Sequence, residues 1–171
     1  MERKPIDYAH VVPEALSAML GLERVVRASG LEPLLLELVK VRASQINGCA
    51  RCLEMHTKDA RALGEDQERL DLVAVWEEAP CFTSREHAAL GWCEVLTRIG
   101  DTRVPDESYR AVEEQFDQRE IVELTLAVAT INAWNRLNVG LRAPVGDYVS
   151  PHAPNAPNAH GADGASARRV H

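Results

Sequence analysis

The spacing of apolar residues constrains the fold of this chain of 171 residues more than any other feature of its sequence. Between Pro13 and Leu141 the apolar residues recur at the three- and four-residue intervals of amphipathic helices, and no segment alternates as a half-buried strand does. Glycines and prolines divide the helical segments. The pattern predicts helices over about 13–28, 33–46, 49–63, 66–78, 84–99, 105–116 and 120–141. We therefore expect a compact all-α domain of about six or seven helices.

The ends of two of these helices carry specific start signals. Thr83 with Glu86, and Asp117 with Glu120, have the spacing of an N-terminal capping box. The helix that follows Asp117 is apolar on nearly every side through Ile131. A helix of this kind is buried, so we expect it at the centre of the domain or of a subunit interface.

Composition limits the classes of function. The chain is 46% hydrophobic and 26% charged, with a net charge of -7, which is typical of a globular protein and disfavours nucleic acid or an anionic membrane as partner. We see neither a signal peptide nor a transmembrane run, so we expect a cytoplasmic protein with reduced cysteines. Residues 1–142 are expected to form one domain. Residues 143–171, rich in Pro, Ala, Asn, Gly and His, are expected to be a disordered or loosely attached tail.

The stretch from Glu37 to His56 holds the candidate site residues. It reads Glu37, eleven residues, Cys49, two residues, Cys52, three residues, His56. On a helix that starts near Cys49, the two cysteines and the histidine share one stripe, because they lie at positions i, i+3 and i+7. Asn47-Gly48 predicts the end of the preceding helix, and a helix N-terminus favours a thiolate on Cys49. Glu37 lies on that preceding helix, which a short turn folds back so that Glu37 can face the stripe.

Two other interpretations of the cysteines remain open at this point. Cys49 and Cys52 can be small core residues, because free cysteine is often buried and inert. They can also bind zinc together with His56, although we find no fourth ligand and one short helix crowds a tetrahedral site. Cys81 and Cys93 are isolated, and Cys93 lies on an apolar helical face and is expected in the core. We predict a redox pair without a metal.

The pattern E-x11-C-x2-C-x3-H, within ELVKVRASQINGCARCLEMHTKDARALG, resembles the core motif of the AhpD-like alkylhydroperoxidases of the carboxymuconolactone decarboxylase superfamily. The resemblance extends through 120–141, which ends in Ile131-Asn132-Ala133-Trp134-Asn135-Arg136-Leu137-Asn138. It covers most of residues 10–142. For Asn132 and Trp134 two interpretations stand beside each other: a hydrogen-bonded helix end or subunit contact, and a wall at the mouth of the site.

The resemblance implies a peroxidase that works without a bound cofactor. Cys52 would attack a hydroperoxide and Cys49 would then form a disulfide with it, with His56 as the base and Glu37 behind it. The dipole argument alone favours Cys49 as the nucleophile. The oxidised pair would need a dithiol reductant, which in the resembled family can be a lipoylated protein. The resemblance also implies a homotrimer or homohexamer.

One position departs from the pattern. Some AhpD-type enzymes have a histidine next to the second cysteine, where this chain has Arg51. Arginine stays charged and cannot relay protons, but it can lower a thiol pKa if it faces the site. Two alternative functions are an enzyme of the carboxymuconolactone decarboxylase type, against which the CxxC counts, and a non-catalytic dithiol sensor or partner-binding protein.

Overall fold

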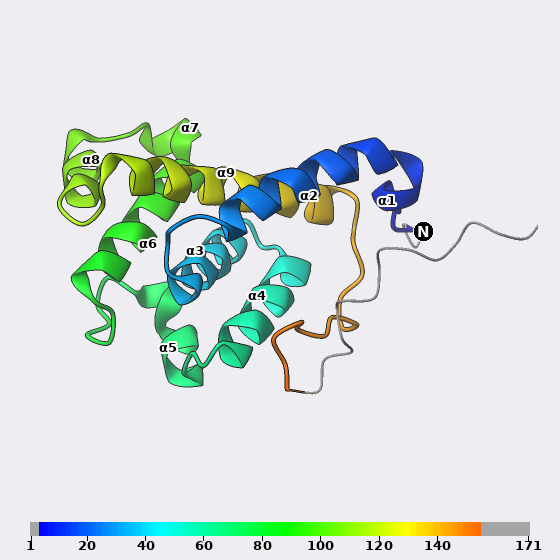
Figure 1. The fold of residues 1–171 in the computed structure, drawn as a ribbon, viewed down its shortest axis with the longest axis horizontal. Coiled ribbons are helices and arrows are strands. Elements are labelled where there is room, and N and C mark those ends of the chain that lie inside the picture. Colours follow the sequence, from blue (N-terminus) through cyan, green and yellow to red (C-terminus); the bar gives the residue numbers. More distant parts are fainter. Residues whose placement is uncertain (1–3, 155–171) are drawn as a thin grey trace, which may run out of the picture.

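A computed structural model describes residues 4–154, and all regular structure in that range is helical (Figure 1). The elements are α1 (Tyr8–Val11), α2 (Pro13–Arg27), α3 (Pro33–Ile46), α4 (Ala50–Ala62), α5 (Gln67–Leu72), the 3-10 turn η1 (Val73–Val75), α6 (Ser84–Thr97), α7 (Ile99–Thr102), α8 (Asp106–Glu113) and α9 (Gln118–Gly140). The all-α prediction is confirmed. The sequence pattern missed α1 and α7, each a single turn too short for periodicity to reveal. No helix of the described range is long and apolar enough to cross a membrane.

The centre of the fold is α3, which packs against α4, α6 and α9. It is buried on nearly every side from Leu35 to Ser44. The sequence pattern had placed α9 at the centre of the domain or of a subunit interface, and within the domain α3 takes this place. In the structure α9 lies along the top of the molecule beside α2, and it keeps an exposed stripe that includes Val122 and Ala129 (Figure 1). α3 is the central helix because other helices pack against it on several sides. The composition of α3 alone does not predict these contacts.

The turn between α3 and α4 places the cysteines. Gly48 adopts a positive φ of 63°, a conformation that favours glycine. Its N–H donates to the carbonyl of Gln45 at 3.2 Å, and the N–H of Cys49 donates to the carbonyl of Ser44 at 2.9 Å. This pair of bonds is the Schellman ending of a helix. Because α4 begins directly afterwards, Cys49 becomes its N-cap residue, and α4 folds back against α3.

Amide side chains fasten the end of α3 to α9. The side-chain nitrogen of Asn47 donates to Asn132 Oδ1 at 2.9 Å and to Asn135 Oδ1 at 2.8 Å. Asn135 donates in turn to Ser44 Oγ at 3.2 Å. Buried polar groups must find such partners, and here they hold α9 in register with the cysteine turn. Both predicted capping boxes, at Thr83 and at Asp117, are present.

The predicted C-terminal tail lies only partly within the described residues. Residues 143–154 leave α9 and run back toward α4 (Figure 1, orange). Tyr148 and Gly146 make hydrogen bonds to side chains of α4, and Ser150 is buried. Residues 155–171 lie outside the described range.

Candidate active site

Glu37 and His56 meet as the motif predicts. Glu37 Oε2 lies 2.8 Å from His56 Nδ1, and both side chains are buried. Lys40, one turn further along α3, donates to Glu37 Oε1 at 3.3 Å. Burial by itself raises the pKa of Glu37, but the hydrogen bond and charge of His56, together with Lys40, outweigh it and lower this pKa to about 2. The carboxylate therefore stays ionised and fixes the orientation of the imidazole.

The two cysteines lie at the start of α4 as free thiols. The Cys49 sulfur accepts the backbone N–H of Cys52 at 3.4 Å, as an N-cap side chain does. Asn138, near the end of α9, donates its amide to Cys52 Sγ at 3.2 Å. Tyr8 of α1 donates its hydroxyl to Asn138 Oδ1 at 3.1 Å, which orients that amide. Both sulfurs are thus held by donors, and both side chains are almost fully buried.

The pKa values of the two cysteine thiols are shifted in opposite directions. The side-chain hydrogen bond from the Cys52 thiol is the largest cause that lowers the pKa of Cys49, and it brings this pKa to about 6 despite burial. The same hydrogen bond, with burial next, raises the pKa of Cys52. These opposite pKa shifts favour the thiolate on Cys49 and the proton on Cys52. This agrees with the helix-dipole argument for the resting state.

This distribution predicts an unusual thiol titration. Because the pKa of Cys49 is lowered to about 6, its thiolate should form as the pH rises through about 6, whereas an ordinary cysteine ionises near pH 8.5. Ultraviolet thiolate absorbance of the reduced protein should show this step, and Cys49→Ser should lack it. A first ionisation that begins only above about pH 8 would contradict the arrangement.

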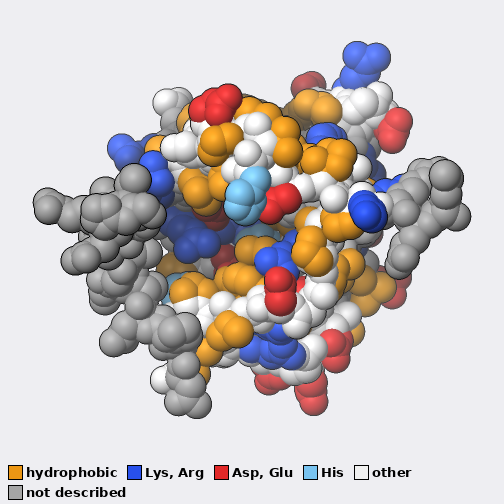
Figure 2. Space-filling model, turned by 90° about the vertical axis from the view of Figure 1, so that its right-hand side faces the viewer, with side chains coloured by type: hydrophobic (Ala, Val, Ile, Leu, Met, Phe, Trp, Pro, Cys, Tyr) orange, Lys and Arg blue, Asp and Glu red, His pale blue; other side chains and the backbone are white. Residues whose placement is uncertain are grey.

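A cavity of about 240 Å³ is lined by one of the two cysteines. Its lining consists of Tyr8, Leu16, Leu20, Glu23, Arg27, Arg51, Cys52, Met55, His56, Trp134 and Asn138. Cys52 and His56 are part of the wall, whereas Cys49 and Glu37 are behind it. Figure 2 views the molecule from the side of α1 and the C-terminal segment, where hydrophobic side chains surround a hollow in which basic side chains are visible. Of the two cysteines, the cavity is lined by Cys52 and not by Cys49.

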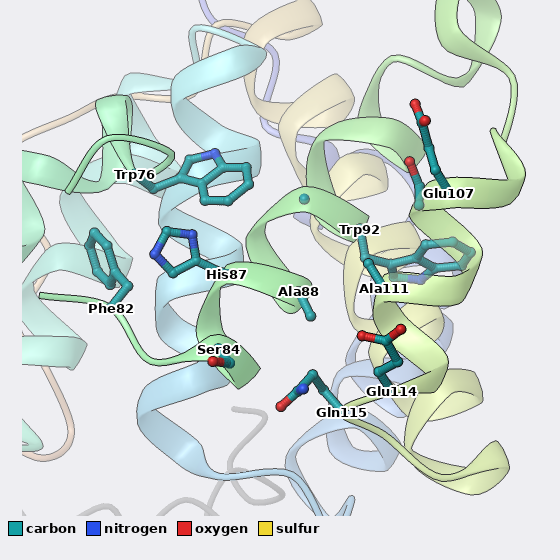
Figure 3. Close-up of a pocket in the computed structure, with 12 residues that line it drawn as sticks. Trp76, Phe82, Ser84, His87, Ala88, Trp92, Glu107, Ala111, Glu114 and Gln115 are labelled. Carbon is teal, nitrogen blue, oxygen red and sulfur yellow. The ribbon is translucent and has the colours of Figure 1, made fainter. Parts of the chain in front are cut away.

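A second hollow, of about 740 Å³, is larger but lacks this chemistry. It lies between α6 and α8, and its wall includes Trp92, Glu107 and Glu114 (Figure 3). His87 lies between the rings of Trp76 and Phe82, at centroid distances of 5.3 and 6.2 Å (Figure 3). No cysteine lines it. We therefore assign the site to the smaller cavity, whose wall contains a thiol beside a histidine.

Glu37, His56 and Asp59 bring donor atoms within 4.8 Å of one another, a spacing that a metal ion can use. The donors already have partners, however. Lys40 bonds to Glu37, and the Tyr148 hydroxyl donates to both oxygens of Asp59 at 2.8 and 2.9 Å. A cation would have to displace an ammonium group and a phenol, so the residues fit a network of hydrogen bonds better than a metal centre.

Several site residues escaped the sequence analysis. Tyr8 and Lys40 had no motif to mark them, and Asn138 was seen only as one of several polar residues at the end of the last helix. Of the two candidates for the mouth of the site, Trp134 lines the cavity, whereas Asn132 bonds to Thr97, Asn47 and Arg136. Arg51 also lines the cavity and forms an ion pair with Asp147.

Known proteins resemble this chain in sequence and in fold. A model of the carboxymuconolactone decarboxylase family matches residues 13–94. The uncharacterized protein YdfG of Bacillus subtilis (strain 168) is 38% identical over 136 residues, which are 80% of this chain and 92% of YdfG.

Two solved structures extend the likeness. A protein of unknown function from Agrobacterium tumefaciens, ATU0492, suggested to be the antioxidant defence protein AhpD, is 42% identical, with a TM-score of 0.81 over 84% of this chain and 100% of that one. An uncharacterized peroxidase-related protein from Ralstonia eutropha JMP134, with an alkylhydroperoxidase AhpD core, is 21% identical, with a TM-score of 0.72 over 82% of this chain and 74% of that one. The second likeness concerns the fold alone.

Proposed function

Because the chain belongs to the carboxymuconolactone decarboxylase family and is AhpD-like, we propose that it is a thiol-dependent peroxidase that reduces hydroperoxides through Cys49 and Cys52. One observation carries this proposal: Cys52 and His56 share the wall of a cavity, and Cys49 lies directly behind Cys52. This is the arrangement that a nucleophile, its base and a resolving thiol need.

The first step uses Cys52, because it is the sulfur that a substrate can reach. The Cys52 proton passes to His56, whose Nδ1 is fixed by Glu37 and whose Nε2 is left for transfer. The thiolate attacks the peroxide, the O–O bond breaks, and Cys52 becomes a sulfenic acid. His56 then gives the proton to the departing alkoxide, which leaves as an alcohol. The amide of Asn138 steadies the sulfur as its charge develops.

The second step explains why the resting thiolate lies on Cys49. A thiolate directly behind Cys52 is ready to attack the sulfenic sulfur. The new S–S bond expels hydroxide, which takes up a proton to give water. An external dithiol then reduces the disulfide by thiol–disulfide exchange and is itself oxidised. By analogy with the resembled family, we propose a lipoylated protein for this role, in the reducing cytoplasm.

The wall of the cavity limits the substrate. Leu16, Leu20, Met55 and Trp134 offer an apolar surface beside Cys52. Such a surface suits the organic group of an alkyl hydroperoxide better than hydrogen peroxide, which has none.

The test is catalytic turnover. Reduced protein, an organic hydroperoxide and excess dihydrolipoamide should give one oxidised dithiol for each peroxide consumed, over many cycles. A dithiol sensor would be oxidised once without sustained turnover, and an enzyme of the decarboxylase type would not consume peroxide. Stoichiometric zinc in freshly purified protein would also contradict the proposal.

We further propose a homotrimer or homohexamer. Val122 lies on the exposed stripe of α9, and Val25 is exposed on the neighbouring α2. The relative exposure of each residue is 58%. Large apolar side chains in such positions become buried when subunits pack together.

Light scattering tests the assembly. We expect an oligomer for the full chain and also for a chain that ends at Arg142, because residues 143–171 contain few large apolar groups. A full-length monomer at micromolar concentration would refute the assembly. Loss of the oligomer in the shortened chain alone would show that the C-terminal residues take part in it.

A further inference from the structure

The C-terminal segment follows one face of α4, the helix that carries the site. Arg51, Glu54 and Lys58 form a stripe on α4, and each contacts this segment. Arg51 forms an ion pair with Asp147, Glu54 accepts the N–H of Gly146 at 2.7 Å, and Lys58 donates to the carbonyl of Tyr148 at 2.8 Å. These contacts fix the backbone on both sides of the Tyr148 side chain.

Tyr148 uses this position to reach a buried carboxylate. Its hydroxyl lies 2.8 Å from one oxygen of Asp59 and 2.9 Å from the other, and the side chain of Asp59 is almost fully buried. Burial is the largest cause that raises the pKa of Tyr148, and the bond to Asp59 raises it further. The phenol therefore remains a donor at any physiological pH, and it satisfies a carboxylate that would be costly to bury alone.

Asp59 lies beside the pair at the heart of the site. Asp59, Glu37 and His56 each have one donor atom in this cluster, and the three atoms lie within 4.8 Å of one another. Two buried carboxylates, from α3 and α4, thus flank a single imidazole. The site reaches the thiols through His56, whose charge is one of the smaller causes that lower the pKa of Cys49, after the side-chain hydrogen bond from Cys52.

We propose that Tyr148 and Asp59 are positioning residues of the redox site, through which the C-terminal segment holds His56 and sets the reactivity of the cysteine pair. This inference deepens the proposed peroxidase function and rests on it. Neither residue touches the substrate cavity, so each acts through His56. In this proposal the segment after α9 contributes to the site by holding Asp59 in place.

Other charged groups also surround this cluster. They are Glu23 and Arg27 from α2, Glu37 and Lys40 from α3, Arg51 from α4, Tyr8 from α1 and Asp147 from the C-terminal segment. Lys40 bonds to both Glu23 and Glu37, at 3.0 and 3.3 Å, so the charges of α2 and α3 are largely paired with each other. Asp59, in contrast, has the neutral Tyr148 hydroxyl as its hydrogen-bond donor.

The experiment compares Tyr148→Phe with Tyr109→Phe. Tyr109 is an exposed tyrosine on α8, far from the cysteines in sequence and outside both cavities. Loss of the Tyr148 hydroxyl leaves Asp59 without its hydrogen-bond donor, so the buried carboxylate is no longer held in place beside His56. We expect the pH midpoint of Cys49 ionisation, measured by ultraviolet thiolate absorbance, to rise by about half a pH unit. Below the midpoint this corresponds to roughly threefold less thiolate. Tyr109→Phe should leave it in place.

A double-variant cycle separates this role from a general loosening of the structure. Asp59→Asn should move the step in the same direction, and Tyr148→Phe in the Asp59→Asn background should add nothing further, because the hydroxyl acts only through that carboxylate. A titration of Tyr148→Phe identical to that of the wild type, or fully additive shifts, would overturn the proposal. The thiol titration needs no peroxide, so it decides this inference even if peroxide turnover fails.

Discussion

Replacing Cys52 with serine should abolish peroxide turnover. Cys52 lines the cavity and Cys49 does not, so the proposed mechanism has no other thiol to serve as the nucleophile. Steady-state consumption of an organic hydroperoxide with excess dihydrolipoamide measures the effect. Cys81→Ser is the matched control, because Cys81 is a half-buried cysteine outside the site, and it should keep full turnover.

The Cys49→Ser variant should stop after the first oxidation of Cys52. Cys52 can still be oxidised once, but no second thiol resolves the product, so a sulfenic acid should accumulate and react with a dione trap. A trapped sulfenic acid on Cys49 in the Cys52→Ser variant, with none on Cys52 in Cys49→Ser, would reverse the assigned order of the two cysteines.

Glu37→Gln should lower the peroxidase rate roughly tenfold to a thousandfold. Glutamine keeps the volume and a hydrogen bond to His56 but removes the negative charge that stabilises the imidazolium. Glu37 acts through His56, so we expect less than the full loss of an acid–base group. The fold should survive, because Lys40 keeps its other partner, Glu23, at 3.0 Å.

The matched control for this change is Glu113→Gln on the exposed face of α8, which should leave the rate unaltered. Circular dichroism should report the same helix content for both variants and the wild type. Unchanged peroxidase activity in Glu37→Gln would remove Glu37 from the mechanism.

Local patterns were sufficient to predict the elements and the centre of the site. Helical spacing and the Asn47-Gly48 signal predicted where α3 ends, and the positive φ of Gly48 is the physical reason. The spacing from Glu37 to His56 predicted that the two side chains can meet, because two helices joined by one tight turn must lie side by side.

Contacts between distant segments could not be predicted in this way. The apolar character of α9 pointed to the centre of the domain or of a subunit interface, and within the domain α3 occupies the centre because α4, α6 and α9 surround it. Likewise Asn138 and Tyr148 reach α4 across 86 and 89 residues of sequence, and nothing in their own neighbourhood predicts these contacts. A composition rich in Pro, Ala and Asn concealed the contacts of the segment that carries Tyr148.

The central claim is that Cys49 and Cys52 form one redox pair. Its most direct test is the mass of the intact reduced protein after one equivalent of an organic hydroperoxide. We predict the loss of two hydrogen atoms, a peptide in which Cys49 is linked to Cys52, and recovery of the starting mass with dihydrolipoamide. An unchanged mass, or oxygen added to Cys81 or Cys93 with Cys49 and Cys52 still reduced, would contradict it.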